Sequence, residues 1–474
     1  MTNPLRPRPG ARRAAFAAAL LLLAVGIIPA RVARAQTSAA AAPIPAAAMP
    51  KTTLDVLANG LRVIVVERRG SAKIVAIDLR VRAGIAHETP ENNGVAHFLE
   101  HLIFKGTPTR PPGDVDGVIE GVGGELTANT SLDWAQFAAT VPFGAFRQAL
   151  EVLADVVQNP ALRASDLETE RRVILDEMAA AELDPVRSSL LALSARAFPD
   201  HPYRLSLYGS AENVQRFTRD DVLAFWRALY VPTNMTLVVV GDAARANVLE
   251  AARAFFTFPN AAAAAPTPNV VEAVLPDPAP LTGVVRAAPL VRDRSLVTVT
   301  LGFRAPAVRA AEDAVALDAL LPLLATGGEG GRLGDALVRK QNLALSVSAG
   351  YLTQRAPGLL TVSATGRGGE EKQLEDALLA EIRRLREDGV SEAEADNARR
   401  SALGQTLFEQ ETFAGQASVL AFYDVLGAPD FAARYVERLA SVSAADLARV
   451  IRAYLTPDRC VITTVVPVKE AARR

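Results

Sequence analysis

The segment "TRDDVLAFWRALYVPTNMTLVVVGD", residues 218–242, has the pattern of a capped amphipathic helix, a proline-bearing turn and a β-branched strand. The same pattern returns as "SAADLARVIRAYLTPDRCVITTVVP", residues 443–467. An offset of 225 residues aligns Asp221 with Asp446, and it also aligns the prolines of the two turns. A repeat this long indicates a duplicated domain rather than a solenoid of short units.

The segments that begin the two halves also correspond. "KIVAIDLRVRAG" starts at Lys73 and "RSLVTVTLGFRAP" starts at Arg294, and both alternate as half-buried strands do. In each half the predicted strands lie toward the two ends, and long helical segments fill the middle. This order is typical of α+β domains. We therefore predict two homologous α+β domains, each with a mostly antiparallel sheet and helices packed on one face.

The start of the chain predicts export. Arginines precede an apolar run from Ala14 to Ile28, and the small-x-small pattern Ala33-Arg34-Ala35 follows, as in a signal peptide. A membrane anchor is the alternative, but the run is shorter than the roughly 20 residues that a span requires. Ala/Pro-rich stretches mark a leader and an interdomain linker. The predicted organisation is a signal peptide at 1–35, a flexible leader at 36–50, an N-terminal domain at 51–258, a linker at 259–280 and a C-terminal domain at 281–474.

Cleavage of the signal peptide would change the charge of the chain. The first 35 residues hold six arginines and no acidic residue, so the net charge would move from −1 to −7. This balance argues against a nucleic-acid or anionic-membrane partner. Cys460 is the only cysteine, and its apolar surroundings predict a buried packing residue. We expect an exported, periplasmic protein without a stable membrane anchor.

The segment "GVAHFLEHLIFKG", residues 94–106, carries residues with metal chemistry. At 100° per residue, His97, Glu100 and His101 share one face of a helix, opposite an apolar stripe. Two imidazoles in this arrangement can bind one zinc ion, with the glutamate beside it to act on a water molecule. A solvated polar face is the alternative, but two of the chain's four histidines fall in this pattern. We interpret the segment as two thirds of a zinc site.

A catalytic zinc ion takes a third protein ligand. Candidate carboxylates cluster in "SDLETERRVILDEMAAAELDP", residues 165–185, where Glu170 and Glu177 lie two turns apart on one helix face. Either one could bind the metal while the other supports it. Ser165 and Glu168 are expected to form a capping box at the start of this helix.

Other polar residues near these helices are expected to have structural roles. Asn92 or Asn93 is predicted to cap the start of the histidine-bearing helix, and Gly106 to end it. His87 and His201 are interpreted as structural or turn residues.

These residues resemble the inverted-motif zinc peptidases, the insulinase and pitrilysin family, and especially its bacterial branch similar to mitochondrial processing peptidase. "GVAHFLEHLIFKGT" matches the family's first signature almost residue for residue. The resemblance implies one Zn²⁺ per chain, His97 and His101 as ligands, and Glu100 as the general base of peptide hydrolysis. It also implies Glu177, 76 residues after His101, as the third ligand. Glu170 then becomes the carboxylate that supports the site.

The resemblance further implies that a peptide substrate binds as an added strand beside the metal. The corresponding segment is "GGELTANTSLDWAQFAATVP", residues 123–142, where Thr127, Ala128 and Asn129 are the candidate substrate contacts. Relatives usually carry Asn where this chain has Thr127. The segment suits an edge strand, although an internal hairpin strand is the alternative.

The second half departs from the family. Active members carry an Arg and a Tyr there that bind substrate and stabilise the oxyanion, but the corresponding positions here are Val338 and Leu345. Arg339 is turned by about 100° from the required direction, and Tyr351 cannot be assigned the role. Some relatives form heterodimers in which one chain carries zinc and the other carries the Arg/Tyr pair. We expect such a heterodimer, with the glycine-rich segment at residues 324–334 as a flexible loop near its chamber.

Three functions follow from these patterns. The first is a zinc endopeptidase subunit that hydrolyses unfolded peptides and is completed by a homologous chain carrying Arg and Tyr. The second is a zinc-holding, non-catalytic peptide-binding or scaffold subunit. The third is a self-sufficient homodimer that uses other donors. Glu100 favours an enzyme, because a binding protein has no need of a general base.

Overall fold

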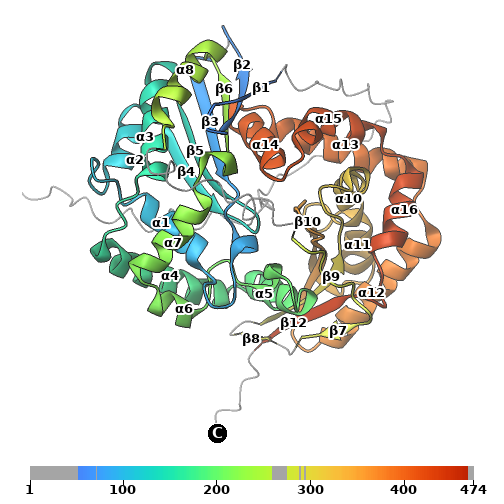
Figure 1. Cartoon of the computed structure of the whole chain (residues 1–474). Helices are drawn as coiled ribbons and strands as arrows, with labels where there is room; N and C mark the ends of the chain where they lie inside the picture. The colour runs from blue at the N-terminus through green and yellow to red at the C-terminus, as the bar shows by residue number, and fades with distance from the viewer. Residues whose placement is uncertain (1–51, 71, 259–274, 288–289, 293–294, 468–474) are drawn as a thin grey trace, which may run out of the picture. The chain divides into compact units, whose positions relative to one another are not determined.

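The computed structural model describes residues 52–70, 72–258, 275–287, 290–292 and 295–467 (Figure 1). The predicted signal peptide, the leader and most of the predicted linker lie outside these residues. Residues 275–282 are described and contain no helix or strand. Among the described residues, no helix is long and apolar enough to cross a membrane.

The N-terminal half forms a six-stranded sheet in the order β1-β2-β6-β3-β5-β4. Its neighbouring strands are antiparallel except β2 and β6, which run parallel. The strands are β1 (Thr53–Val56), β2 (Arg62–Glu67), β3 (Ile74–Val81), β4 (Glu125–Thr130), β5 (Ala135–Pro142) and β6 (Met235–Gly241).

The C-terminal half repeats this topology. Its sheet has the order β10-β11-β9-β12-β7, and β8 also pairs with β12. The path β4-β5-β3-β6 therefore corresponds to β10-β11-β9-β12, and a parallel neighbour follows in both sheets. The strands are β7 (Val285–Arg286), β8 (Leu290–Arg292), β9 (Leu296–Arg304), β10 (Ala344–Tyr351), β11 (Leu359–Arg367) and β12 (Val461–Pro467). The predicted duplication and α+β class are confirmed. Whether each half is a separate domain with the predicted bounds stays a prediction.

Most helices of each half pack on one face of that half's own sheet, as predicted (Figure 1). Those of the N-terminal half are α1 (Val95–Ile103), α2 (Asp114–Gly121), α3 (Phe146–Gln158), α4 (Ala164–Leu183), α5 (Pro185–Ala197), α6 (Ala211–Arg216), α7 (Arg219–Leu229) and α8 (Arg245–Phe255). Those of the C-terminal half are α10 (Ala311–Leu324), α11 (Gly331–Leu333), α12 (Glu371–Asp388), α13 (Glu392–Glu409), α14 (Phe413–Val425), α15 (Pro429–Ser441) and α16 (Ala444–Tyr454).

The repeated helix-turn-strand unit begins with the same cap in both halves. Thr218 and Asp221 form a capping box at the start of α7, and Ser443 and Asp446 form one at the start of α16. In each box the side chain satisfies backbone N–H groups that have no partner within the helix. Cys460 precedes β12 and is fully buried, as predicted.

The expectation that β3 and β9 are half-buried is wrong. Both are buried along nearly their whole length, because α14 lies against β3 and β6 while α5 lies against β9 and β12 (Figure 1). Each half thus supplies one helix to the second face of the other half's sheet. The polar side chains of β3 face α14 rather than water: Arg80 donates to Ser418 Oγ at 2.8 Å and stacks over the Trp134 ring at 4.2 Å.

A buried ion pair ties α14 to the N-terminal sheet. Asp424, whose side chain is fully buried, accepts hydrogen bonds from Arg62 Nε at 2.9 Å and Nη2 at 2.6 Å. Thr236 Oγ1 also donates to this carboxylate at 2.6 Å. Arg82 Nε donates to the Val425 carbonyl at the end of α14, at 2.9 Å. Because these groups satisfy one another away from water, the loss of one leaves the others uncompensated.

The Asp424→Asn variant is expected to lower the free energy of unfolding by about 3 kcal/mol, because it leaves the Arg62 charge without its partner. Denaturant unfolding of both chains measures the difference. The control is Asp376→Asn, which breaks the exposed pair between Lys372 and Asp376 on α12 and should cost less than about 0.5 kcal/mol. Equal losses in the two variants would show that the pair beneath α14 contributes no special stability.

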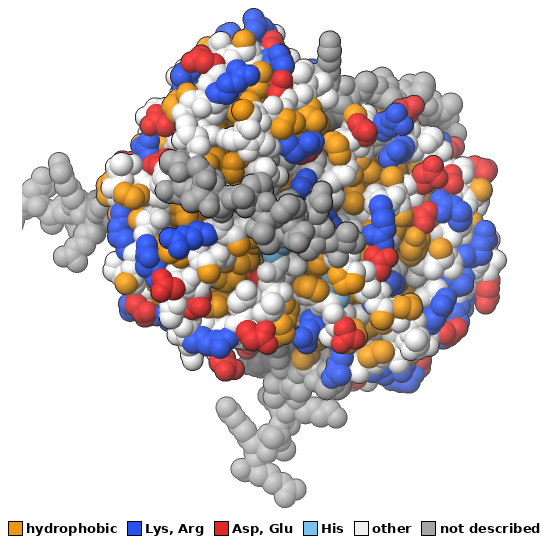
Figure 2. Space-filling model, in the orientation of Figure 1, with side chains coloured by type: hydrophobic (Ala, Val, Ile, Leu, Met, Phe, Trp, Pro, Cys, Tyr) orange, Lys and Arg blue, Asp and Glu red, His pale blue; other side chains and the backbone are white. Residues whose placement is uncertain are grey.

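Charges of both signs are mixed on the face of the molecule that Figure 2 presents. Figure 2 shows Lys and Arg side chains interspersed with Asp and Glu over the face it presents, without a large area of one sign. A continuous basic surface of the kind that binds nucleic acid is not seen on this face.

Candidate metal centre

The helix that carries both histidines, α1, begins at a buried carboxylate. Glu88 Oε1 accepts from the Ala96 backbone N–H at 2.8 Å, and Oε2 accepts from the Gly94 N–H at 3.0 Å. Asn93 is not the predicted cap, because its side chain donates to Glu88 Oε2 at 2.7 Å. Asn92 instead caps the preceding turn through the Thr89 N–H. Burial raises the pKa of Glu88 to about 7, against the opposing effect of these hydrogen bonds.

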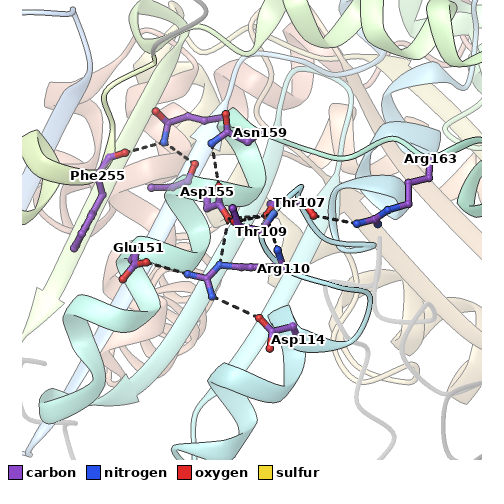
Figure 3. Close-up of polar contacts among 11 residues, drawn as sticks. Thr107, Thr109, Arg110, Asp114, Glu151, Asp155, Asn159, Arg163 and Phe255 are labelled. Carbon is purple, nitrogen blue, oxygen red and sulfur yellow. Dashed lines mark hydrogen bonds and ion pairs between the residues drawn. The ribbon is translucent and has the colours of Figure 1, made fainter.

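The loop after α1 is fixed by a polar network (Figure 3). Arg163, which precedes α4, donates to the Lys105 carbonyl at 2.9 Å and to the Thr107 carbonyl at 3.0 Å. Thr107 Oγ1 donates to Asp155 on α3 at 2.8 Å. Gly106 does not end the helix as predicted, because α1 stops at Ile103 with Phe104 as its cap, but the φ of 97° at Gly106 suits glycine in the loop that follows. The network ties the end of α1 to the start of α4, which carries the candidate carboxylates.

The structure brings His97, His101 and Glu177 together. The Nε2 atoms of the two histidines are 3.3 Å apart, and Glu177 Oε2 lies 3.6 Å from each. Two nitrogen ligands about 2.0–2.1 Å from a tetrahedral zinc ion would be separated by roughly the same distance. The three side chains can therefore reach one ion. The two histidines come from α1 and Glu177 comes from α4. The apolar face of α1, on which Phe98 and Leu102 are fully buried, holds that helix in place.

The two glutamates of α4 take different positions. Glu170 Oε2 lies 2.9 Å from His101 Nδ1, on the side of the ring away from Glu177, and Oε1 lies 2.7 Å from Lys105 Nζ. Glu177 therefore faces the Nε2 atoms of both histidines, whereas Glu170 contacts the Nδ1 atom of His101. The predicted capping box is wrong, because α4 already begins at Ala164 and the Glu168 side chain pairs with Arg171 instead.

Unpaired buried atoms at the centre of the cluster fit a metal ion. Both carboxylate oxygens of Glu177 are buried without a hydrogen-bond partner, and so is Oε2 of Glu100. Buried carboxylate oxygens are costly to leave unpaired. A mixed histidine and glutamate donor set suits zinc. The residues present therefore fit this ion.

The ionisation of the cluster is set by burial and by neighbouring charges. Burial lowers the pKa of His97 well below its usual value, and His101 lowers it further, which favours the neutral form that metal binding would require. Burial opposes a charge on His101, but Glu170 and Glu177 raise its pKa to about 9. Burial also raises the pKa of Glu100, with a further contribution from Glu177.

The segment at residues 123–142 forms two strands, and both interpretations of it hold in part. β4 is an edge strand of the described sheet, and β5 is an internal strand that pairs with β4 and β3. The three candidate substrate residues lie on β4. Thr127 is exposed, and it lines a cavity of about 300 Å³ together with Asp78, Gln136 and Gly415. Ala128 packs toward the N-terminal core, and Asn129 pairs in register with Gln136.

The two C-terminal positions at which active relatives carry Arg and Tyr have no side-chain hydrogen-bond donor in this chain. Val338 packs against the C-terminal core, and Leu345 is an exposed side chain on β10. Arg339 is exposed and pairs with Asp335, one turn earlier. Tyr351 is buried, and its hydroxyl donates to the Pro306 carbonyl at 3.0 Å. Neither neighbouring residue replaces the missing chemistry. Gly328, in the glycine-rich segment, accepts from the Val347 N–H, and the flexibility of this segment stays a prediction.

The remaining histidines lie in turns, as predicted. His87 ends a 3-10 turn and accepts from the Gly84 N–H, and His201 accepts from the Tyr203 N–H at 3.1 Å. Burial is the main reason that the pKa of each falls to about 4.

Sequence patterns missed two features of the site, Glu88 and Tyr208. The Tyr208 ring lies edge-on to His97, with 5.3 Å between ring centroids. A glycine after Tyr208 is the one local signal of unusual backbone there, and it does not indicate which side chain faces the histidine.

Comparison with known proteins shows the family. Residues 63–211 match the insulinase family, peptidase family M16, and residues 216–402 match the peptidase M16 inactive domain. A probable mitochondrial-processing peptidase subunit beta of Arabidopsis thaliana is 31% identical over 369 residues, which cover 76% of this chain and 68% of that protein. The chain belongs to the insulinase family of peptidases, as predicted from its sequence.

One further sequence comparison agrees with this family, and one structure comparison agrees with the fold. The zinc protease PqqE of Helicobacter pylori is 26% identical over 415 residues, which cover 86% of this chain and 90% of that protein. The crystal structure of a protease from Helicobacter pylori has a TM-score of 0.82 at 24% identity, covering 88% of this chain and all of that one. The second likeness supports the two-sheet fold.

Proposed function

We propose that the chain is a zinc-dependent endopeptidase subunit, exported to the periplasm, that hydrolyses unfolded peptides together with a homologous partner chain. The observation that carries the proposal is the metal-binding cluster. The ligand atoms of His97, His101 and Glu177 all lie within 4.8 Å of one another. Glu100 lies on the same helix, with an unpaired carboxylate oxygen. A site that only held a metal would not require this fourth group.

The side chains have distinct roles in the proposed reaction. When bound, zinc supplies Lewis acidity to a water molecule and to the peptide carbonyl. Glu100 accepts the proton from the attacking water and delivers it to the leaving amine, for which a raised pKa is favourable. Glu170 accepts a hydrogen bond from His101 Nδ1, which keeps the Nε2 lone pair directed toward Glu177.

The free edge of β4 is the proposed peptide-binding element. An extended substrate can pair with the backbone of Thr127, Ala128 and Asn129, because β4 has a described neighbour, β5, on one side only. Backbone pairing requires an unfolded substrate. The cavity beside Thr127 offers space for a substrate side chain.

A partner chain is proposed because the side chains of Val338 and Leu345 carry no hydrogen-bond donor. Polar donors aimed at the developing oxyanion are among the largest contributions to hydrolysis. The Arabidopsis relative is named as a subunit, which is consistent with assembly from more than one chain. The alternative is a zinc-holding, non-catalytic peptide-binding or scaffold subunit, which the same two substitutions favour and the retained Glu100 disfavours.

This proposal is tested by cleavage of an unfolded peptide whose fluorescence is quenched until the peptide is cut. The chain alone, a homologous chain carrying the Arg and Tyr, and the mixture are compared at equal zinc. We expect the mixture to cleave much faster than either chain. If the mixture is no faster than this chain alone, the partner requirement is wrong. If no sample cleaves although zinc is bound, the scaffold function is supported instead.

A further inference from the structure

The loop that contains Tyr208 is held against the start of α1 by a close backbone contact. Gly94 and Gly209 both have positive φ, 100° and 83°. A Cβ atom on either would lie 2.7 Å from the Cα of the other, so the two backbone segments approach closely only because both residues are glycine. The contact fixes Tyr208 beside the helix that carries the histidines.

Three hydrogen bonds reinforce this contact. Asn93 Nδ2 donates to the Ser206 carbonyl at 2.8 Å. Asn213 Nδ2 donates to the carbonyls of Pro90 and Asn93, at 2.8 Å and 3.2 Å. The segments on both sides of Tyr208 are thus tied to the residues that precede α1. A side chain held in this way is oriented before substrate arrives, which is what a group aimed at a transition state requires.

The Tyr208 ring lies against His97, and its hydroxyl is a hydrogen-bond donor. Its ring meets the ring of His97 edge-on, and its oxygen accepts a hydrogen bond from Arg187 Nη1 on α5 at 2.9 Å. A phenol that accepts from a guanidinium keeps its own hydrogen for donation.

Hydrolysis at this cluster needs a donor of this kind. Attack on a peptide carbonyl places negative charge on its oxygen, and a hydrogen-bond donor aimed at that oxygen stabilises the charge. The Arg187 charge behind Tyr208 polarises the hydroxyl toward donation. The tyrosine therefore supplies the type of group that Val338 and Leu345 do not.

We propose that Tyr208, polarised by Arg187, is a catalytic residue that donates a hydrogen bond to the oxyanion formed on the substrate carbonyl. This role rests on the proposed peptidase function. It gives the zinc-bearing chain a donor of its own, in addition to any that a partner provides. Bond changes are those of hydrolysis: water adds to the carbonyl, the C–N bond breaks, and the Tyr208 proton stays on its oxygen.

The test uses Tyr208→Phe, which keeps the ring against His97 and removes only the hydroxyl. A ring that merely orients the histidine would be unaffected by this change. The readout is the Kd of a phosphinic peptide, a tetrahedral mimic of the oxyanion, measured by calorimetry on the zinc-loaded chain. We expect Tyr208→Phe to weaken binding of the phosphinic peptide by about 10²-fold and to leave the zinc content unchanged. Binding of an ordinary peptide is measured in Glu100→Gln chains, which do not cleave it. There, addition of Tyr208→Phe should leave the Kd of the ordinary peptide unchanged.

The matched control is Tyr454→Phe, which removes a hydroxyl bonded to Asp313 in the C-terminal half and should alter none of these values. A phosphinic peptide that binds Tyr208→Phe within threefold of the parent would overturn the proposal. So would a parent chain that binds the phosphinic peptide no better than the ordinary peptide. The proposed function fails by a separate result, a Glu100→Gln chain that cleaves peptide as fast as the parent.

Discussion

Glu100→Gln is expected to lower kcat for peptide cleavage by about 10³-fold, the loss typical of removing a positioned general base. The amide fills the same volume but cannot accept a proton from water. Glu100 is not one of the three candidate zinc ligands, so the variant should keep its bound zinc. Single-turnover cleavage of an unfolded peptide, together with metal analysis of the same sample, measures both quantities.

The control for this change is Glu168→Gln. Glu168 is exposed on α4 and pairs with Arg171, so its loss should leave kcat within twofold of the parent. If Glu100→Gln cleaves as fast as the parent, Glu100 is not the general base. If it loses its zinc, the carboxylate contributes to metal binding instead.

Glu177→Gln is expected to abolish cleavage by weakening zinc binding. Its carboxylate lies 3.6 Å from both Nε2 atoms, and its oxygens have no other partner. A neutral amide is a poor zinc ligand, so two ligands would remain. The Kd of zinc, measured by competition with a chromophoric chelator, reads this directly.

Glu170→Gln provides the matched comparison, seven residues earlier on the same helix. It removes the partner of His101 Nδ1, and such supporting carboxylates typically change metal affinity by about 10–100-fold. We therefore expect a clearly larger loss for Glu177→Gln. The opposite order would exchange the roles of the two glutamates.

The local geometry of the site could be predicted from the sequence. The spacing of His97, Glu100 and His101 determines a shared helix face, and burial of Phe98 and Leu102 on the other face follows from the same period. The pair of glutamates on α4 was visible for the same reason. Their separate roles followed from the family resemblance, since spacing alone left either one possible.

Non-local packing could not be predicted. The Glu88 carboxylate that caps α1 lies six residues before Gly94, outside the spacing of ordinary caps. The alternation in β3 predicted a solvated side, because nothing local indicates that α14 covers Arg80. Tyr208 lies beside His97 because two glycines more than a hundred residues apart come into close contact.

The proposed function requires that this chain hydrolyses peptides with a zinc ion held by His97, His101 and Glu177. The most direct measurement follows cleavage of an unfolded peptide by the assembled enzyme after removal of metal with a chelator and stepwise return of zinc. Cleavage is expected to disappear when the metal is removed and to return fully at one zinc per chain. Cleavage that continues unchanged in a sample shown to be free of metal would contradict it.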